Sequence, residues 1–317
     1  MKLTNNKFLK YLCNPKKIPG KLQDILIYHF PNITSNDKLY LEIYYRLRTG
    51  KKLDLKNPKT FNEKTQWLKL FDRKPEYTQM ADKYSSSDFV SERIGNEYTI
   101  PLLGVWDHFS EIDFSSLPNR FALKCTHDSG GVAICTDKKS FRFLDKKGVQ
   151  LDMATVKEKM NSSLRKNYFY KGREWAYKDI LPRIIAQEFI ENNENKPLMD
   201  YKIFTFNGKP KFIQVHLEKS ADQLKANFYS TDWCYQEFCI EEQNDKDIQV
   251  QKPLHLAKML ELAEKLSQGT LFLRVDFFYI NDKIYFGEFG FYNWGGFGKF
   301  TPECYDELLG SYITLPG

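Results

Sequence analysis

The sequence lacks any apolar run near the roughly 20 residues that a transmembrane helix needs. Its N-terminus also lacks the apolar core of a secretory signal peptide, so we expect residence in the cytoplasm. Its six cysteines include no Cys-x-x-Cys pair, which argues against a zinc site and against a disulfide framework. Most of these thiols are therefore expected to be buried in a reducing compartment.

A strong charge of one sign is also missing. Lys and Arg number 47 against 41 Asp and Glu, a formal net charge of +6. With no recognised nucleic-acid module, this mixed charge excludes nucleic acid as the expected partner. The positive excess gathers in residues 1–24, where Asp24 is the single acidic residue. Such an arm suits either peripheral contact with the inner membrane surface or a solvated, frayed terminus.

Two glycine-rich phosphate-binding signatures, Gly-x-Gly-x-x-Gly and Gly-Lys-Ser/Thr, are absent, so any nucleotide site must have another design. Residues 20–95 favour helices, among them one after the capping box Thr60–Glu63 and one from Glu76 to Ile94. From Asn96 onward the pattern favours antiparallel hairpins, with a further helix over 253–268. This order predicts an α+β fold rather than a doubly wound sheet.

The most informative segment is a predicted hairpin whose two strands flank Asn281-Asp282. Arg274 and Asp276 project from one face of its first strand, and the return strand can bring Glu288 back toward them. Two carboxylates suit Mg²⁺ with phosphate oxygens, and Arg steadies a transferring phosphoryl group. The alternative is a surface ion-pair group, but these charges interrupt strongly apolar strands, where unpaired charge is costly.

Three weaker signals precede this hairpin. Lys124 lies in a predicted strand over 121–126 that precedes a small-residue turn, which suits a phosphate clamp made by Ser129, Gly130 and Gly131. An extended acidic segment could read adenine through its backbone and ribose through a carboxylate; it comprises Gln187, Glu188, Phe189, Ile190 and Glu191. Lys202 opens another strand and could face the same phosphates. Taken singly, each signal equally suits an ordinary turn, a strand end or a solvated lysine.

In this order the four signals resemble the ATP-grasp superfamily, in which two α+β lobes hold ATP between them. Leu273-Arg274-Val275-Asp276-Phe277 looks like a segment of D-alanine–D-alanine ligases in which the Arg is catalytic and the Asp binds metal. A closer resemblance, to the TupA-like ATP-grasp family, spans nearly the whole chain. It rests on segments such as Pro58–Lys64, Gln66–Leu70, Ala81–Tyr84, Ile100–Trp106, Leu123–Cys125, Asp200–Lys202, Gly298–Pro302 and Tyr305–Gly310.

The resemblance implies roles by position. Lys124, the 128–134 turn and Lys202 would meet the phosphates, and Arg274 would stabilise the reacting centre. Gln187, Glu188 and Ile190 would line adenine and Glu191 would meet the ribose, while Asp276 and Glu288 would hold Mg²⁺. One position departs from the pattern: the metal-binding Asn expected two residues after Glu288 is Gly290. Asn293 or water would then complete the metal's ligands.

We therefore expect a cytoplasmic ATP-grasp ligase that forms an amide through an acyl phosphate. The resemblance implies a hexuronic acid of a bacterial capsular or cell-wall polysaccharide as the carboxylate, and a small amine as its partner. The alternatives are a sugar kinase, a non-catalytic ATP-binding accessory protein and a glycosyltransferase, although the predicted order of elements does not match a glycosyltransferase fold. The expected units are a basic arm and helical region over 1–95, a small lobe over 96–190 and a large lobe over 191–317. The loop Phe291–Phe300 is expected to shape the acceptor pocket.

Overall fold

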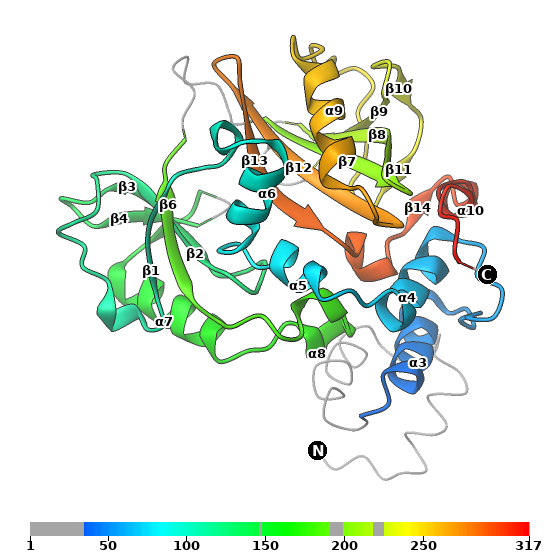
Figure 1. The fold of residues 1–317 in the computed structure, drawn as a ribbon, viewed down its shortest axis with the longest axis horizontal. Helices are drawn as coiled ribbons and strands as arrows, with labels where there is room; N and C mark the ends of the chain where they lie inside the picture. The colour runs from blue at the N-terminus through cyan, green and yellow to red at the C-terminus, as the bar shows by residue number, and fades with distance from the viewer. Residues whose placement is uncertain (1–34, 146–147, 191–198, 218–224, 317) are drawn as a thin grey trace.

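The computed structural model describes residues 35–145, 148–190, 199–217 and 225–316. Two six-stranded sheets dominate these residues (Figure 1). The basic arm, Cys13 and Glu191 lie outside the described residues. Within the described ranges, no helix combines the length and apolar character that a bilayer crossing requires.

The first sheet has the strand order β1-β6-β2-β3-β4-β5, antiparallel throughout. Its strands in chain order are β1 (Leu102–Trp106), β2 (Phe121–Cys125), β3 (Val132–Asp137), β4 (Arg142–Leu144), β5 (Gln150–Leu151) and β6 (Ile184–Glu188). Helix α7 (Met153–Leu164), capped by Asp152, packs against β2. The buried core of this sheet includes Phe121, Phe143 and Met160. Short helices η4 (Phe109–Glu111), α8 (Phe169–Gly172) and η5 (Trp175–Tyr177) complete this part of the chain.

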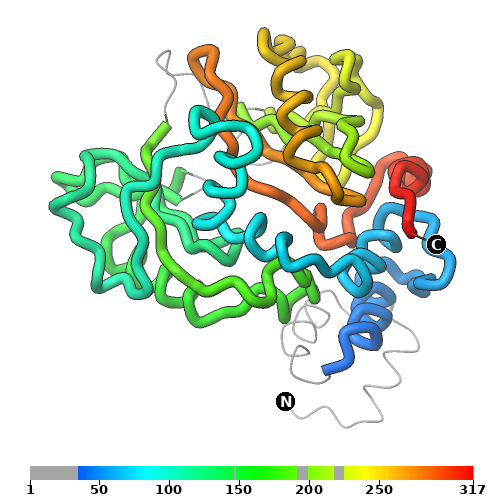
Figure 2. The backbone as a smooth tube through the Cα atoms, in the orientation of Figure 1, coloured from blue at the N-terminus to red at the C-terminus, as the bar shows by residue number. Residues whose placement is uncertain are grey.

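The second sheet has the order β10-β9-β8-β7-β12-β13, also antiparallel. Its strands are β7 (Asp200–Phe206), β8 (Lys209–His216), β9 (Ala226–Ser230), β10 (Tyr235–Gln236), β12 (Phe272–Ile280) and β13 (Lys283–Gly290). Helix α9 (Leu256–Leu266) packs against β7, β8 and β12. A small pair of strands, β11 (Cys239–Ile240) and β14 (Phe300–Thr301), leads to α10 (Cys304–Ser311). The course of the described residues, coloured from blue at the first helix to red at α10, can be followed in Figure 2.

Among the described residues, four α-helices precede the first strand in the chain. They are α3 (Asp37–Thr49), α4 (Phe61–Phe71), α5 (Glu76–Ala81) and α6 (Ser86–Ile94), followed by η3 (Asn96–Tyr98). Phe61 at the start of α4 is 1% exposed, and its ring centroid lies 4.8 Å from that of Phe272. Burial of such a ring contributes about 2–3 kcal/mol. One hydrophobic core therefore joins α4, α5 and α6 to the second sheet.

Local predictions hold in several places. Thr60 and Glu63 form the expected capping box, and Gly95 ends α6. Asn207 and Gly208 have φ of 48° and 75°, as a type I′ turn between β7 and β8 requires. Asn281-Asp282 likewise joins β12 to β13 with positive φ at both positions.

Two predicted helices have different bounds. The helix expected over Glu76–Ile94 breaks at Asp82, whose extended backbone lets Lys83 N donate to Thr126 O at 3.1 Å. The helix expected over 253–268 begins only at Leu256, so Pro253 precedes it rather than opening it. The hydrogen bond from Lys83 to Thr126 interrupts the first predicted helix. A turn at residues 254–255 delays the start of the second.

Candidate active site

Two charged residues of the predicted hairpin and one from the neighbouring strand β7 lie in one row across the sheet. Asp276 on β12 pairs in register with Lys202 on β7 and with Glu288 on β13. Side chains paired across antiparallel strands lie on the same face, so the row gathers one cation and two carboxylates. Lys202 Nζ lies 2.8 Å from Asp276 Oδ2 and 2.7 Å from Asp200 Oδ2.

Arg274 lies one pair further along the same face. Its Nε lies 2.7 Å from Asp276 Oδ1, and Nη2 donates to Asp276 Oδ2 at 2.7 Å. Nη1 donates to Asn293 Oδ1 at 3.0 Å, and Glu288 Oε1 lies 3.6 Å from Nη2. Gly290 pairs with Arg274 across the strands, and a Cβ at 290 would lie 3.1 Å from Arg274 Cζ. The departure at Gly290 thus leaves room for the guanidinium.

The two carboxylates differ in exposure. The Asp276 side chain is 3% exposed, whereas that of Glu288 is 42% exposed. Burial raises the pKa of Asp276, but Arg274 and Lys202 outweigh it, so this pKa lies below its ordinary value. Burial also raises the pKa of Glu288, and Lys83, Lys202 and Arg274 together bring it below its ordinary value. Both groups are therefore anionic at neutral pH.

Mg²⁺ accepts one or two carboxylates together with phosphate oxygens. Asp276 and Glu288 fit that requirement, because both are anionic and Glu288 is accessible. Asn293 is 3% exposed, and its Oδ1 accepts from Arg274. Among the residues the structure describes, no three His, Cys, Asp or Glu side chains form a cluster able to hold a metal ion.

The turn after β2 is held in place by its own side chains. Asp128 Oδ1 accepts from Gly131 N at 2.9 Å, and Ser163 Oγ donates to Asp128 Oδ2. A Cβ at Gly131 would lie 2.7 Å from Cys125 Sγ, so a larger residue would displace the turn. A Cβ at Gly130 would meet nothing closer than 3.9 Å, which leaves that backbone approachable.

The residues expected near adenine lie on the first sheet. Lys124 Nζ donates to Gln187 Oε1 at 2.8 Å across β2 and β6. Gln187 is 8% exposed and Glu188, next to it, is exposed. Glu188 N donates to Pro101 O at 3.0 Å, and Ile190 is half-buried just beyond β6. Lys124 and Gln187 therefore contact each other on this sheet.

A cavity of about 400 Å³ brings the two sheets and the N-terminal helices together. From the second sheet it receives Arg274, Glu288 and Gly290, and from the first it receives Asp128 and Ser129. Lys202, Asp276, Lys124 and Gln187 are not among its lining residues. The rest of its wall comes from Tyr44, Arg48, Lys83, Tyr168, Lys171, Gly172, Glu174, Tyr177, Phe289, Phe291, Tyr292, Asn293, Trp294, Gly295 and Phe297.

The loop Phe291–Phe300 contains the short helix η6 (Asn293–Gly296), which is hydrogen-bonded to α4. Gln66 Nε2 donates to the carbonyls of Gly295 and Gly296 at 3.1 and 2.7 Å, and Lys69 Nζ donates to Gly295 O at 2.7 Å. Gly296 has φ of 69°, and a Cβ there would lie 2.7 Å from Thr65 Cβ. The loop therefore forms a defined wall of the cavity, with Trp294 49% exposed.

Three charged residues of this region were not predicted from the sequence. Lys83 follows the break after α5, lines the cavity, and donates to Asp128 O. Glu174 lines the cavity from the start of η5, and Lys69 is fully buried beneath η6. Lys69 and Lys83 lie in segments that carry the family resemblance, but no motif indicated a role for them or for Glu174. Only the helical period of α4 could have marked Lys69 as a charge on a buried face.

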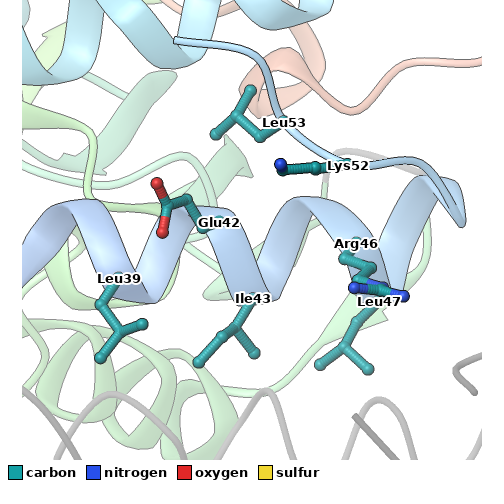
Figure 3. A pocket seen from close by; sticks show the side chains of 7 residues that line it. All are labelled: Leu39, Glu42, Ile43, Arg46, Leu47, Lys52 and Leu53. Atoms are coloured by element: carbon teal, nitrogen blue, oxygen red, sulfur yellow. The ribbon is translucent and has the colours of Figure 1, made fainter. Parts of the chain in front are cut away.

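A second hollow, of about 270 Å³, lies along α3 (Figure 3). Leu39, Ile43 and Leu47 lie along one side of the helix, and Lys52 and Leu53 come from the segment that follows. It contains none of the residues expected at the nucleotide or metal site.

Comparison with solved structures found two ligases and a synthetase at low identity. The D-alanine–D-alanine ligase from Bacillus anthracis complexed with ATP is 13% identical, with a TM-score of 0.36 over 67% of this chain and 53% of that chain. N5-carboxyaminoimidazole synthetase from Staphylococcus aureus complexed with ADP is 11% identical, with a TM-score of 0.39 over 75% and 53%. The L-amino acid ligase from Bacillus licheniformis is 12% identical, with a TM-score of 0.41 over 72% and 48%.

The chain thus spans about half the length of these proteins. No curated protein sequence matches it. A family model described as TupA-like ATPgrasp matches residues 63–314, which is most of the chain. The expected α+β ATP-grasp fold is confirmed, and the chain belongs to the TupA-like ATP-grasp family.

Proposed function

We propose that the protein is an ATP-dependent carboxylate–amine ligase. Its carboxylate substrate is a hexuronic acid of a bacterial capsular or cell-wall glycan, and its second substrate is a small amine. One observation carries the proposal: Lys202, Asp276 and Glu288 stand in one row beside Arg274, next to a cavity that the Ser129 turn also lines. This combination suits a triphosphate and an anionic reacting centre.

Each residue has a proposed role. Lys124, Lys202 and the turn Ser129, Gly130 and Gly131 meet the phosphates of ATP. Gln187, Glu188, Ile190 and Glu191 bind adenine and ribose. Mg²⁺ is held by Asp276 and Glu288, with Asn293 or water beside them, and neutralises phosphate charge. Arg274 stabilises the charge that develops at the transferred phosphoryl group.

The proposed reaction has two steps. A carboxylate oxygen of the uronic acid attacks the γ-phosphorus of ATP, the bond to the bridging oxygen breaks, and ADP leaves with that electron pair. The amine nitrogen then attacks the acyl carbon, and phosphate leaves to give the amide. No serine or cysteine nucleophile is needed, because positioning and charge neutralisation supply the catalysis.

The proposal includes an organisation and a location. The helical region up to residue 95 supports the second sheet, residues 96–190 form the small lobe, and 191–317 form the large lobe. The enzyme works in the cytoplasm, with residues 1–24 near the inner membrane surface. The shared core of α4 and Phe272 supports a helical region that stiffens the large lobe.

The test measures ADP release with ATP, Mg²⁺ and glucuronic or galacturonic acid, with and without ethanolamine or L-alanine. Formation of an amide that requires both uronate and amine supports the ligase. A stable phosphorylated sugar formed without amine would identify a kinase instead. No nucleotide turnover with these substrates or with glycan extracts would favour an accessory role without catalysis.

A further inference from the structure

Glu174 presents a carboxylate to the same cavity as Arg274 and Glu288. It stands just before η5, and two glycines clear the space around it. A Cβ at Gly172 would lie 2.9 Å from Glu174 Oε1, and one at Gly295 would lie 3.3 Å from the same atom. Within the described ranges, the Glu174 side chain has no hydrogen bond and no ion pair within 4.0 Å. Its carboxylate is therefore available to the cavity.

Aromatic rings surround this end of the cavity. The rings of Tyr168 and Tyr177 lie edge to face with centroids 5.1 Å apart, and both residues line the cavity with Tyr292. Burial raises the pKa of Tyr177 and Tyr292, with a smaller contribution from the charge of Glu174, and that charge is the main cause of the raised pKa of Tyr168. All three phenols therefore stay neutral. A carboxylate among aromatic faces is a chemical environment that favours an ammonium group over an anion.

The charge of the buried Lys69 acts on Glu174, but the two side chains form no ion pair within 4.0 Å. Lys69 Nζ donates to Gln66 Oε1 and Gly295 O and lies 4.8 Å from the Phe297 ring centroid. Burial lowers the pKa of Lys69 to about 8, which the charge of Glu174 partly opposes. The charged and titratable groups that face Glu174 are Lys69 of α4, Lys171 of α8, Tyr168, Tyr177 of η5 and Tyr292.

Two of the carboxylates that line the cavity, Glu288 and Glu174, have opposite environments. Glu288 lies among Lys83, Lys202 and Arg274, which hold its pKa below the ordinary value despite burial. Burial raises the pKa of Glu174, with Lys69 and Lys171 only partly opposing it. These opposite surroundings suit Glu288 to remain anionic beside a metal and suit Glu174 to accept a proton. The cations near Glu288 would also repel an incoming ammonium group.

We propose that Glu174 binds the ammonium group of the amine substrate and removes one of its protons. The inference rests on the proposed ligase function and names the residue that serves its second step. One proton passes from nitrogen to the Glu174 carboxylate, and the freed lone pair forms the C–N bond. The C–O bond to phosphate breaks with its electron pair on phosphate, which also takes the second nitrogen proton.

Hydroxylamine separates this step from the first, because it is largely unprotonated at neutral pH and traps acyl phosphates as hydroxamates. With ATP, Mg²⁺ and galacturonic acid, the full chain and its Glu174→Gln variant would be assayed with hydroxylamine and, separately, with ethanolamine. The expected result is a fall of about 100-fold in the ratio of amide to hydroxamate formed, the usual scale of general-base loss. Glu174→Asp keeps the charge and is expected to raise KM for ethanolamine while retaining much of kcat.

Glu158→Gln on the exposed face of α7 is the matched control and leaves the ratio unchanged. An equal loss of both products in Glu174→Gln, or an unchanged ratio, would overturn the role of Glu174 and leave the ligase standing. Absence of hydroxamate from the wild-type protein with galacturonic and glucuronic acid would instead overturn the ligase itself. A Glu174→Gln protein that forms hydroxamate is necessarily folded, so a folding defect cannot imitate the expected result.

Discussion

Lys202 Nζ lies 2.8 Å from Asp276 Oδ2, across a register pair that joins β7 to β12. Asp276 also accepts two hydrogen bonds from Arg274, so its carboxylate contacts both Lys202 and Arg274. Burying these charges costs free energy, and the cost is offset only while all the partners are present. Asp276 is thus expected to organise the cations as well as to bind metal.

Removal of one carboxylate charge is the first test of this arrangement. Asp276→Asn and Glu288→Gln keep the side-chain volume and are expected to abolish turnover while the fold persists. Asp276→Asn also weakens the hold on Lys202 and Arg274, so we expect it to lower thermal stability more than Glu288→Gln does. Steady-state assays and thermal unfolding would measure both effects. Wild-type rates in both variants would remove these residues from the metal site.

The close approach of Gly290 to Arg274 makes a second prediction. A Cβ at 290 would lie 3.1 Å from Arg274 Cζ and Nε, so Gly290→Ala is expected to turn the guanidinium away from Asp276. Loss of one such charged contact corresponds to roughly tenfold or more in kcat. Calorimetric ATP affinity and thermal stability would be measured beside kcat. An unchanged kcat would show that the guanidinium tolerates this neighbour or does not act in the reaction.

The proposed role of the first sheet in nucleotide binding is tested by measuring ATP affinity. Lys124→Ala removes the ammonium that donates to Gln187, and we expect ATP to bind more than tenfold more weakly by calorimetry. A charge-assisted contact to phosphate supports a loss of this size, about 1.5–3 kcal/mol. Lys139→Ala, in the exposed turn between β3 and β4, is the control for the lost charge. Equal affinity in both variants would count against the assignment of Lys124.

Lys69 gives a pH prediction for stability. Burial lowers its pKa from 10.5 to about 8, so in that window the unfolded chain binds the proton more tightly. Raising the pH from about 8 to 10.5 therefore stabilises the wild type relative to Lys69→Met, and the contribution is lost as pH falls through 8. Urea unfolding of both proteins at several pH values would measure the difference. A difference that does not change with pH would show that Lys69 is not charged differently on folding.

Local patterns predicted a good part of this molecule. The capping box of α4 and the hairpin across Asn281-Asp282 depend on residues close in sequence, and both were predicted. The row of Lys202, Asp276 and Glu288 follows from strand alternation once the pairing of β7 with β12 is known. That pairing spans a long stretch of chain, and no local motif specifies it.

The remaining features depend on long-range packing. Glu174 and η6 meet only because α4 fastens the loop at Gly295 and Gly296, more than 220 residues away along the chain. The break of the helix at Asp82 likewise follows from a bond between Lys83 and Thr126. Neither relation leaves a periodic or motif-like trace in the sequence, so the aromatic, Glu174-lined end of the cavity could not be predicted.

A crystal structure with Mg²⁺ and a non-hydrolysable ATP analogue tests the central claim most directly. We expect the triphosphate to lie between the Ser129 turn and the β12–β13 hairpin, with Asp276 and Glu288 on the metal and Lys124 and Lys202 on phosphate oxygens. Adenine is expected beside Gln187 and Glu188. A nucleotide bound elsewhere, or a metal that touches neither carboxylate, would contradict it.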